Sequence, residues 1–291
     1  SQVTSLDLSR TSLGRTGLGY LADYVRDATA VVADLNISEA VIGGAGPTLV
    51  EAVSASSSLE FITIGKGLRL PLKDCYDSDV LDASEKGIEV GGATVIAWWL
   101  TTDVAAAVAR LSLGSNPQIG DEAMVQLLDA LKDVSLTSLD IAETGCGISA
   151  TSKLAELLSG ATKFGAALNS LTLDSNGIFG ELYASGDVKE ADKFVADCDA
   201  FLAALKDSNI LTLSLQKTGI GPLTLRKLAT SLPAALNSLR CGNNPSMVGE
   251  LDKYGRMKTP DAHAEVFRQL TDSLNDRRPD DRRFLRAGSR S

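Results

Sequence analysis

The residue types that most often carry out catalysis are few in this sequence, and their spacing predicts no reactive centre. The single histidine, His263, has no serine and carboxylate partners at a spacing typical of a nucleophilic triad. Cys75, Cys146, Cys198 and Cys241 are far apart and form no CxxC pair, which argues against a zinc site and favours free thiols. We therefore expect a protein that is not an enzyme and that uses no metal or cofactor.

Two glycine-rich stretches resemble phosphate-binding loops only superficially. The sequence GGAG at 43–46 is not followed by the lysine that a P-loop needs, and GRTGLG at 14–19 does not complete a dinucleotide-binding fingerprint. Both are expected to be turns between elements of secondary structure, so no small-molecule substrate is predicted.

The composition and net charge of the chain argue against some classes of binding partner. The chain has 291 residues, a formal net charge of −9 and an apolar content of 44%. Nucleic acids and anionic membranes are poor partners for such a chain, because binding them needs clustered Lys and Arg. No apolar run approaches the roughly 18 residues that span a bilayer, and we expect no leader of the signal-peptide type. We expect a cytoplasmic protein that binds another protein.

One sequence pattern recurs along the chain: a pair of apolar residues spaced as Leu-x-Leu, then a polar residue, then a glycine. Alternation sends both apolar side chains to one face of a short strand. Six strong copies are present. Their apolar pairs are Leu6 and Leu8, Leu111 and Leu113, Leu139 and Ile141, Leu171 and Leu173, Leu213 and Leu215, and Leu239 and Cys241. This frame predicts that Cys146 and Cys241 are buried and reduced.

Three weaker copies lie in the N-terminal third, with apolar pairs at Leu81 and Ala83, Ile62 and Ile64, and Ala40 and Ile42. Residues 36–80 fit the frame least well. Pro71 lies in the stretch GLRLPLKDCYDSD at 67–79, which is expected to be an irregular loop.

The residues that follow each strand predict a turn and then a helix. Asn or Thr after the strand can satisfy buried backbone groups, as at Asn116, Thr144 and Asn176. Apolar residues then recur at helical spacing. Such stripes are 95–100, 123–131, 154–158, 194–205 and 225–232. In the first of them Trp99 is expected in the core and Trp98 at its edge.

This strand–turn–helix pattern resembles the leucine-rich repeat superfamily, in its ribonuclease-inhibitor-like subclass. The resemblance implies an α/β solenoid of about eight units, shaped as a horseshoe, with parallel strands on the concave face and helices on the convex face. We expect the solenoid over 1–255, a C-terminal capping helix over 256–275 and a mobile charged tail over 276–291. An insertion at 179–190 interrupts the pattern, with Phe179 and Tyr183 as exposed candidates.

The concave face is the expected binding surface, and the function it suggests is a non-catalytic interaction module or scaffold. Its small polar side chains could serve solubility alone, but the charge changes from acidic to basic along the chain. The predicted contact residues are Asp7, Asp82, Glu85, Asp140, Glu143, Asp174, Lys217 and Arg240.

An alternative hypothesis is a regulator of an enzyme, either an inhibitor or a GTPase activator resembling the activator of the Ran GTPase. That activator uses an arginine in an early repeat loop, and Arg10 and Arg15 lie in the first repeat here. These positions match nothing beyond the repeat frame.

Overall fold

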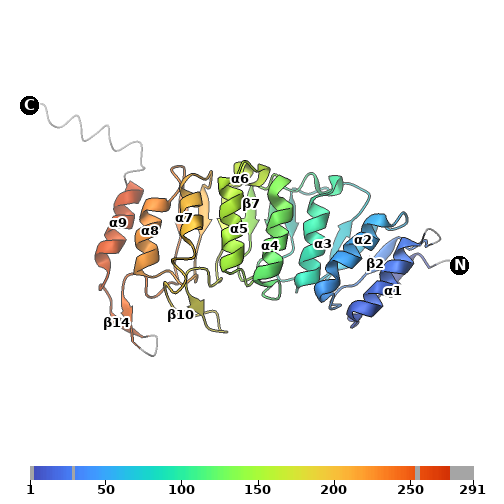
Figure 1. Cartoon of the computed structure of the whole chain (residues 1–291), viewed down its shortest axis with the longest axis horizontal. Helices are drawn as coiled ribbons and strands as arrows, with labels where there is room; N and C mark the ends of the chain where they lie inside the picture. The colour runs from blue at the N-terminus through green and yellow to red at the C-terminus, as the bar shows by residue number, and fades with distance from the viewer. Residues whose placement is uncertain (1–2, 28–29, 253–255, 276–291) are drawn as a thin grey trace, which may run out of the picture.

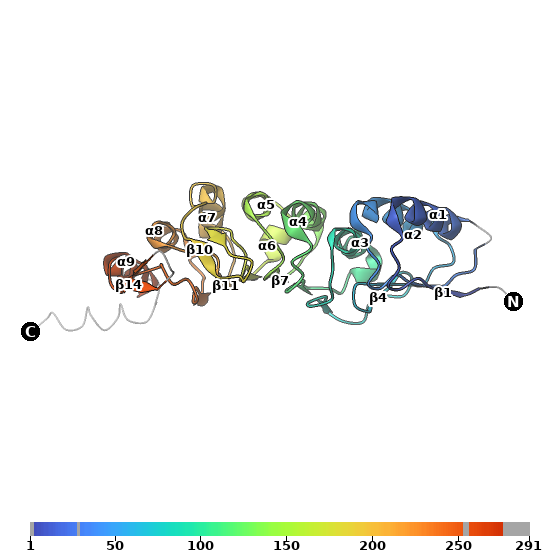
Figure 2. The ribbon, with the colours of Figure 1, turned by 90° about the horizontal axis from the view of Figure 1, so that it is seen from below.

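The computed structural model describes residues 3–27, 30–252 and 256–275, which form an elongated α/β protein (Figure 1). Short strands follow one another along the molecule, and the long helices pack side by side over one face of them (Figure 2). The N-terminal helix and the last helix lie at opposite ends. The other face of the strands is therefore the place where polar side chains can gather.

The largest sheet has six strands, all parallel, and each strand pairs with the next along the chain. The strands are β5 (Val80–Asp82), β6 (Arg110–Ser112), β7 (Ser138–Asp140), β8 (Ser170–Thr172), β11 (Thr212–Ser214) and β12 (Ser238–Arg240). Their central leucines stand in one row of paired residues that begins at Leu81 and ends at Leu239. The Leu-x-Leu pattern thus predicts the position and register of these strands correctly.

A second sheet at the N-terminal end has four strands in chain order. They are β1 (Ser5–Asp7), β2 (Asp34–Asn36), β3 (Phe61–Ile64) and β4 (Leu68–Pro71). The first three are parallel, whereas β4 runs antiparallel to β3. Two sequence-based expectations are wrong here. Residues 67–79 are not simply a loop, since they contain β4, and the second strand lies before Ile37 rather than at Ala40 and Ile42.

Two antiparallel hairpins complete the strands of the described residues. One joins β9 (Glu181–Leu182) to β10 (Val188–Glu190), and the other joins β13 (Glu250–Leu251) to β14 (Met257–Thr259). The expected single leucine-rich-repeat solenoid over 1–255 is therefore wrong: the protein is α/β, but its strands divide among separate sheets. The chain turns back at β4, which takes the edge of β3 that β5 would need, and so ends the first sheet.

The helices alternate with the strands along most of the chain, and several of them are amphipathic. They are α1 (Gly14–Arg26), α2 (Gly46–Ala55), α3 (Val90–Leu100), α4 (Gly120–Ala130), α5 (Ile148–Ser159), α6 (Lys163–Ala167), α7 (Asp199–Lys206), α8 (Pro222–Ser231) and α9 (Ala264–Asn275), with short 3-10 turns at η1 (Gly43–Ala45), η2 (Asp103–Ala105) and η3 (Leu131–Asp133).

Two helix predictions need correction. The stripe at 194–205 is helical only from Asp199, because the residues before it form turns. The predicted capping helix begins at Ala264 rather than at 256, after the β13–β14 hairpin, and buries Val266 and Leu270. The predicted tail at 276–291 lies outside the described residues.

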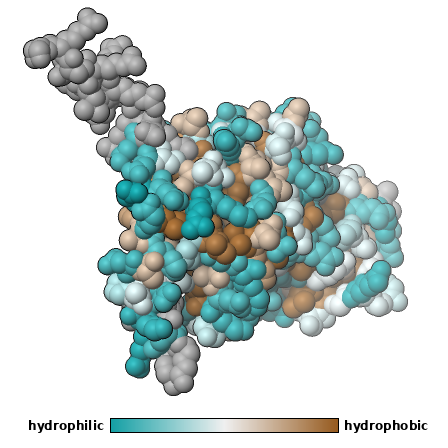
Figure 3. Space-filling view, turned by 60° about the vertical axis from the view of Figure 1, so that its left-hand side comes forward, coloured by the Kyte–Doolittle hydropathy of each residue, from teal (hydrophilic) through white to brown (hydrophobic). Residues whose placement is uncertain are grey.

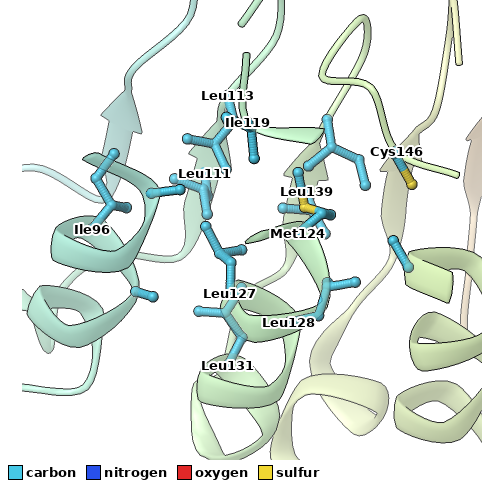
Figure 4. Packing of buried hydrophobic residues seen from close by; sticks show 14 of the residues in the cluster. Ile96, Leu111, Leu113, Ile119, Met124, Leu127, Leu128, Leu131, Leu139 and Cys146 are labelled. Carbon is cyan, nitrogen blue, oxygen red and sulfur yellow. The ribbon is translucent and has the colours of Figure 1, made fainter. Parts of the chain in front are cut away.

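The core lies between the strands and the helices. In Figure 4, Leu111 and Leu139 point from the strands toward Leu127 and Leu128 of α4, and all four are buried. Trp99 is also fully buried and donates a hydrogen bond from Nε1 to the Pro71 carbonyl at 2.6 Å. This bond ties α3 to the end of β4, so the helical layer continues across the gap between the two sheets.

Many apolar side chains are buried, and the exposed large ones include residues at both ends of the molecule, such as Tyr20 of α1. The end that carries α8 and α9 comes forward in Figure 3, where hydrophobic residues gather in the middle of the face between hydrophilic ones. Leu223 of α8 and Phe267 of α9 are among the exposed large apolar residues.

Candidate functional site

The candidate site is the face of the six-stranded sheet that points away from the helices. Because side chains alternate along a strand, the residue between each pair of buried positions lies on this face. Register brings these residues into a row of neighbours: Asp82, Ser112, Asp140, Thr172, Ser214 and Arg240. Six positions that are about 30 residues apart in sequence thus form one continuous polar strip.

A second row lies where each strand of this sheet ends. Its members adopt left-handed backbone angles, with φ between 52° and 58°, which non-glycine residues seldom do. They are Glu85, Ser115, Glu143, Ser175, Lys217 and Asn243. Each of the first five donates its backbone N–H to a carbonyl of the next unit, as Glu143 does to Asp174 at 2.8 Å. The repeated turn therefore holds these side chains at one edge of the sheet.

The carboxylates of Asp140, in the strip, and of Asp174, two residues after Thr172, are fixed by hydrogen bonds. Asp140 accepts from the Ser112 hydroxyl at 3.2 Å and from the Ala142 backbone N–H at 3.0 Å. Asp174 accepts from the Ser214 hydroxyl, from the Gln216 backbone N–H and from the Gln216 side-chain amide, at 2.7 to 2.9 Å. These bonds hold the carboxylates in place but leave their charge uncancelled.

The Asp82 carboxylate is also held by its neighbours. It accepts hydrogen bonds from the hydroxyl and the backbone N–H of Ser84. These bonds lower the pKa of Asp82 below its usual range. Burial raises this pKa by a smaller amount, and the positive charge of Lys86 lowers it slightly. Asp82 is therefore negatively charged at neutral pH.

We call Asp82, Glu85, Asp140, Glu143 and Asp174 the acidic ladder. Within the part of the chain that the structure describes, none of these five side chains forms an ion pair with Lys or Arg. The basic residues Lys217, in the turn after β11, and Arg240, on β12, follow at the C-terminal end of the sheet. The strip therefore has an uncompensated negative part and a shorter positive part.

The four-stranded sheet differs in this respect. Arg10 pairs with Glu39 at 3.1 Å, and Arg69 pairs with Asp34 at 2.8 Å while its guanidinium lies over the Phe61 ring. Its charges are thus largely paired with one another. Asp7, a predicted contact residue, lies on β1 of this sheet, so the structure does not bring it into the row with the other predicted site residues.

The insertion at 179–190 forms a wall beside the acidic ladder. Its tip and the turns after β6, β7, β8 and β11 line an open pocket of about 360 Å³, with Glu143, Ser175, Tyr183 and Lys217 among the lining residues. Tyr183 is 55% exposed, as expected, but Phe179 is fully buried and belongs to the core. The hairpin was not predicted, because its two strands are too short to show a pattern of alternation.

Groups that could do chemistry are not gathered at this site. No cluster of His, Cys, Asp and Glu suited to a metal ion occurs among the residues described. His263 precedes α9, and its backbone N–H bonds to the Val248 carbonyl. Cys146 and Cys198 are buried, whereas Cys241, expected to be buried, is only half-buried. The arrangement can offer charge and hydrogen bonds to a ligand, which is the chemistry of binding.

The helices of the described ranges include none with the length and apolar character to cross a bilayer. Arg10, the arginine considered for GTPase activation, is held by Glu39, and Arg15 lies exposed in the first turn of α1. The hypothesis of an enzyme regulator stays a prediction.

No family model and no characterised protein matches this chain. Together with the division of the strands into separate sheets, this overturns the predicted resemblance to the leucine-rich repeat superfamily. Any function must therefore be inferred from this chain's own surface.

Proposed function

We propose that this protein is a non-catalytic interaction module that binds a basic segment of another protein along the acidic ladder. The observation that carries the proposal is the group of five carboxylates, on and beside the polar sheet face, that form no ion pair with Lys or Arg among the described side chains.

Two physical features support binding at this face. The carboxylates of Asp140 and Asp174 are already oriented by hydrogen bonds, so little side-chain entropy is lost when a partner docks. Neighbouring strands lie about 4.8 Å apart, which places Asp82 and Asp140, two strands apart, within about a Debye length of each other. Their fields add, and a basic partner would be attracted before contact.

The basic residues beyond the acidic ladder suggest how charge is distributed along the partner segment. Lys217 and Arg240 follow the acidic ladder along the same face, so an extended partner segment would place acidic residues at that end. The four cysteines are free, which agrees with a reducing compartment, and we propose the cytoplasm as the place of action.

The test removes charge and keeps one acceptor oxygen at each position, although Asp140 and Asp174 accept through both oxygens and their Asn variants lose part of these hydrogen bonds. Asn can still accept through its side-chain oxygen, so we expect the triple variant Asp82→Asn, Asp140→Asn and Asp174→Asn to fold. Partners are first captured with the wild-type protein, and one is purified. Its association rate with the triple variant should fall roughly tenfold at low salt and less at high salt.

A matched control carries the same change of net charge elsewhere. Asp103, Asp133 and Asp207 are exposed and lie outside the sheet face, so the triple Asn variant at these positions should associate at nearly the wild-type rate. Equal slowing by both triple variants would mean that net charge, and not the acidic ladder, steers the partner. An unchanged rate in the ladder variant would refute the proposal.

A further inference from the structure

The pocket beside the acidic ladder has a volume of about 360 Å³, which is enough to take a side chain. The turns after β6, β7, β8 and β11 form one wall, and residues 182–186 of the hairpin form the other. The hairpin that contains β10 hangs from the edge of the molecule where these turns lie (Figure 1). The pocket therefore opens at the carboxyl ends of parallel strands, where open sheets commonly bind ligands.

The hairpin wall is held firmly at its base. A Cβ atom added to Gly219 would lie 2.5 Å from the Cα atom of Gly180, so the base of the hairpin sits directly against the turn after β11. Glu181 pairs with both Lys189 and Lys193, and these hydrogen bonds lower the pKa of Glu181 to about 2. The pocket is thus already formed before any ligand arrives.

The tip of the hairpin presents an aromatic ring to solvent at the pocket. The Tyr183 backbone N–H bonds to the Asp187 carbonyl at 2.8 Å, and the Gly186 N–H bonds to the Tyr183 carbonyl at 2.9 Å. The backbone of Tyr183 is therefore fixed, although its side chain is 55% exposed. An exposed ring on a fixed backbone can provide a face for a ligand to stack on.

The pocket lining carries one acidic residue, Glu143, and one basic residue, Lys217, and two more carboxylates belong to residues next to the lining in sequence. Glu143 lines the pocket, with Oε2 accepting a hydrogen bond from the Ser115 hydroxyl at 2.9 Å and no ion pair among the described residues. Asp187 stands in the same hairpin turn as Tyr183, and Asp174 lies one residue before Ser175 of the pocket wall. Lys217 is the one basic residue in the lining.

We infer that this pocket holds the guanidinium group of an arginine side chain of the bound protein, stacked on Tyr183 and bonded to Glu143. The inference rests on the proposed function, since it names the anchor of the same basic partner. A guanidinium group fits better than an ammonium group, because it is planar, stacks on aromatic faces and offers several donors to a carboxylate. A carboxylate ligand would meet Glu143 and a guanidinium group would meet Lys217, but the additional carboxylates of Asp174 and Asp187 favour the cation.

The experiment compares two probes of equal charge, a fluorescein-labelled peptide of nine arginines and one of nine lysines. We expect the wild-type protein to bind the arginine peptide more tightly. Tyr183→Ala should weaken binding of the arginine peptide roughly two- to fivefold, the size of an exposed cation–π contact, and leave the lysine peptide nearly unchanged. Tyr183→Phe keeps the ring and should keep the preference.

Glu143→Gln tests the carboxylate, since Gln retains an acceptor for Ser115 but loses the charge. It should also reduce the preference for arginine, and the double variant with Tyr183→Ala should abolish it. Tyr20→Ala is the matched control, because Tyr20 is 73% exposed on α1, outside the pocket lining. Melting curves verify that each variant is folded.

The outcomes separate this inference from the proposed function. If both peptides bind equally and both lose affinity in the acidic-ladder variant, the ladder binds cations and the arginine pocket is wrong. If neither peptide binds, both proposals fail. If an arginine preference persists in the double variant, the arginine is held elsewhere on the protein.

Discussion

The side chain of Asn176 accepts a hydrogen bond at 3.1 Å from the backbone N–H of Cys146, a residue of the preceding unit. The same oxygen accepts from the Thr144 N–H, and the amide group donates to the carbonyls of Ile141, Leu173 and Asp174. Asn116 and Asn244 make the same kind of bridge in their own units. One buried side chain thus holds two consecutive turns together, which fixes the row of turn residues at the site.

Replacing Asn176 with Ala is expected to lower the free energy of unfolding by about 3 kcal/mol, because buried backbone groups on both turns lose their partners. Urea denaturation followed by circular dichroism measures this change. Asn209→Ala serves as a control, since the Asn209 side chain donates an exposed hydrogen bond to the Ala166 carbonyl. A loss for Asn176→Ala no larger than the loss for Asn209→Ala would contradict the bridging role.

Asp121 is expected to make stability depend on acid pH. It accepts the backbone N–H groups of Gly147, Ser149 and Ala150 at the start of α5. Burial raises the pKa of Asp121, but the hydrogen bonds, that from Ala150 foremost, lower it by a larger amount. The pKa of Asp121 therefore lies below its ordinary value of 3.8. The folded pKa is therefore below the unfolded pKa, and the stabilisation is present above about pH 4 and lost as the pH falls through the folded pKa.

The measurement compares the wild type with Asp121→Asn by urea denaturation at pH 7, 5 and 3. At pH 7 the variant should be less stable by about 1 kcal/mol, as for loss of a helix cap, and this difference should shrink toward pH 3. Asp133→Asn, at an exposed position, should show no such trend. A constant difference across the three pH values would exclude the carboxylate as its source.

The cysteines should differ in reactivity according to burial. Burial raises the pKa of Cys146 to about 12 and that of Cys198 to about 12, whereas Cys75 is exposed. At pH 8 a thiol reagent should therefore label Cys75 quickly in the native protein and label Cys146 and Cys198 only after unfolding. Mass spectrometry of timed samples identifies the labelled sites, and Cys75→Ser should abolish the fast phase. Fast labelling of Cys146 would place it outside the core.

Much of the site could be predicted from spacing alone. Asp82, Asp140 and Arg240 were expected on the polar face because each stands beside a buried leucine, and the pairing register places them there. The left-handed turns at Glu85, Glu143 and Lys217 could not be predicted, since these residue types carry no preference for positive φ. Their repetition becomes visible only in the backbone.

The sequence by itself determined the local units of this protein. Leu-x-Leu specifies a short strand with one buried face, and apolar residues at helical spacing specify the helix that covers it, because both patterns depend on neighbours along the chain. Only the tertiary structure decided how the strands combine. The chain turns back at β4 to end one sheet, and the hairpin at 179–190 brings Tyr183 beside Glu143 and Lys217. Such contacts join residues of different units, and they depend on how whole elements pack rather than on any local pattern.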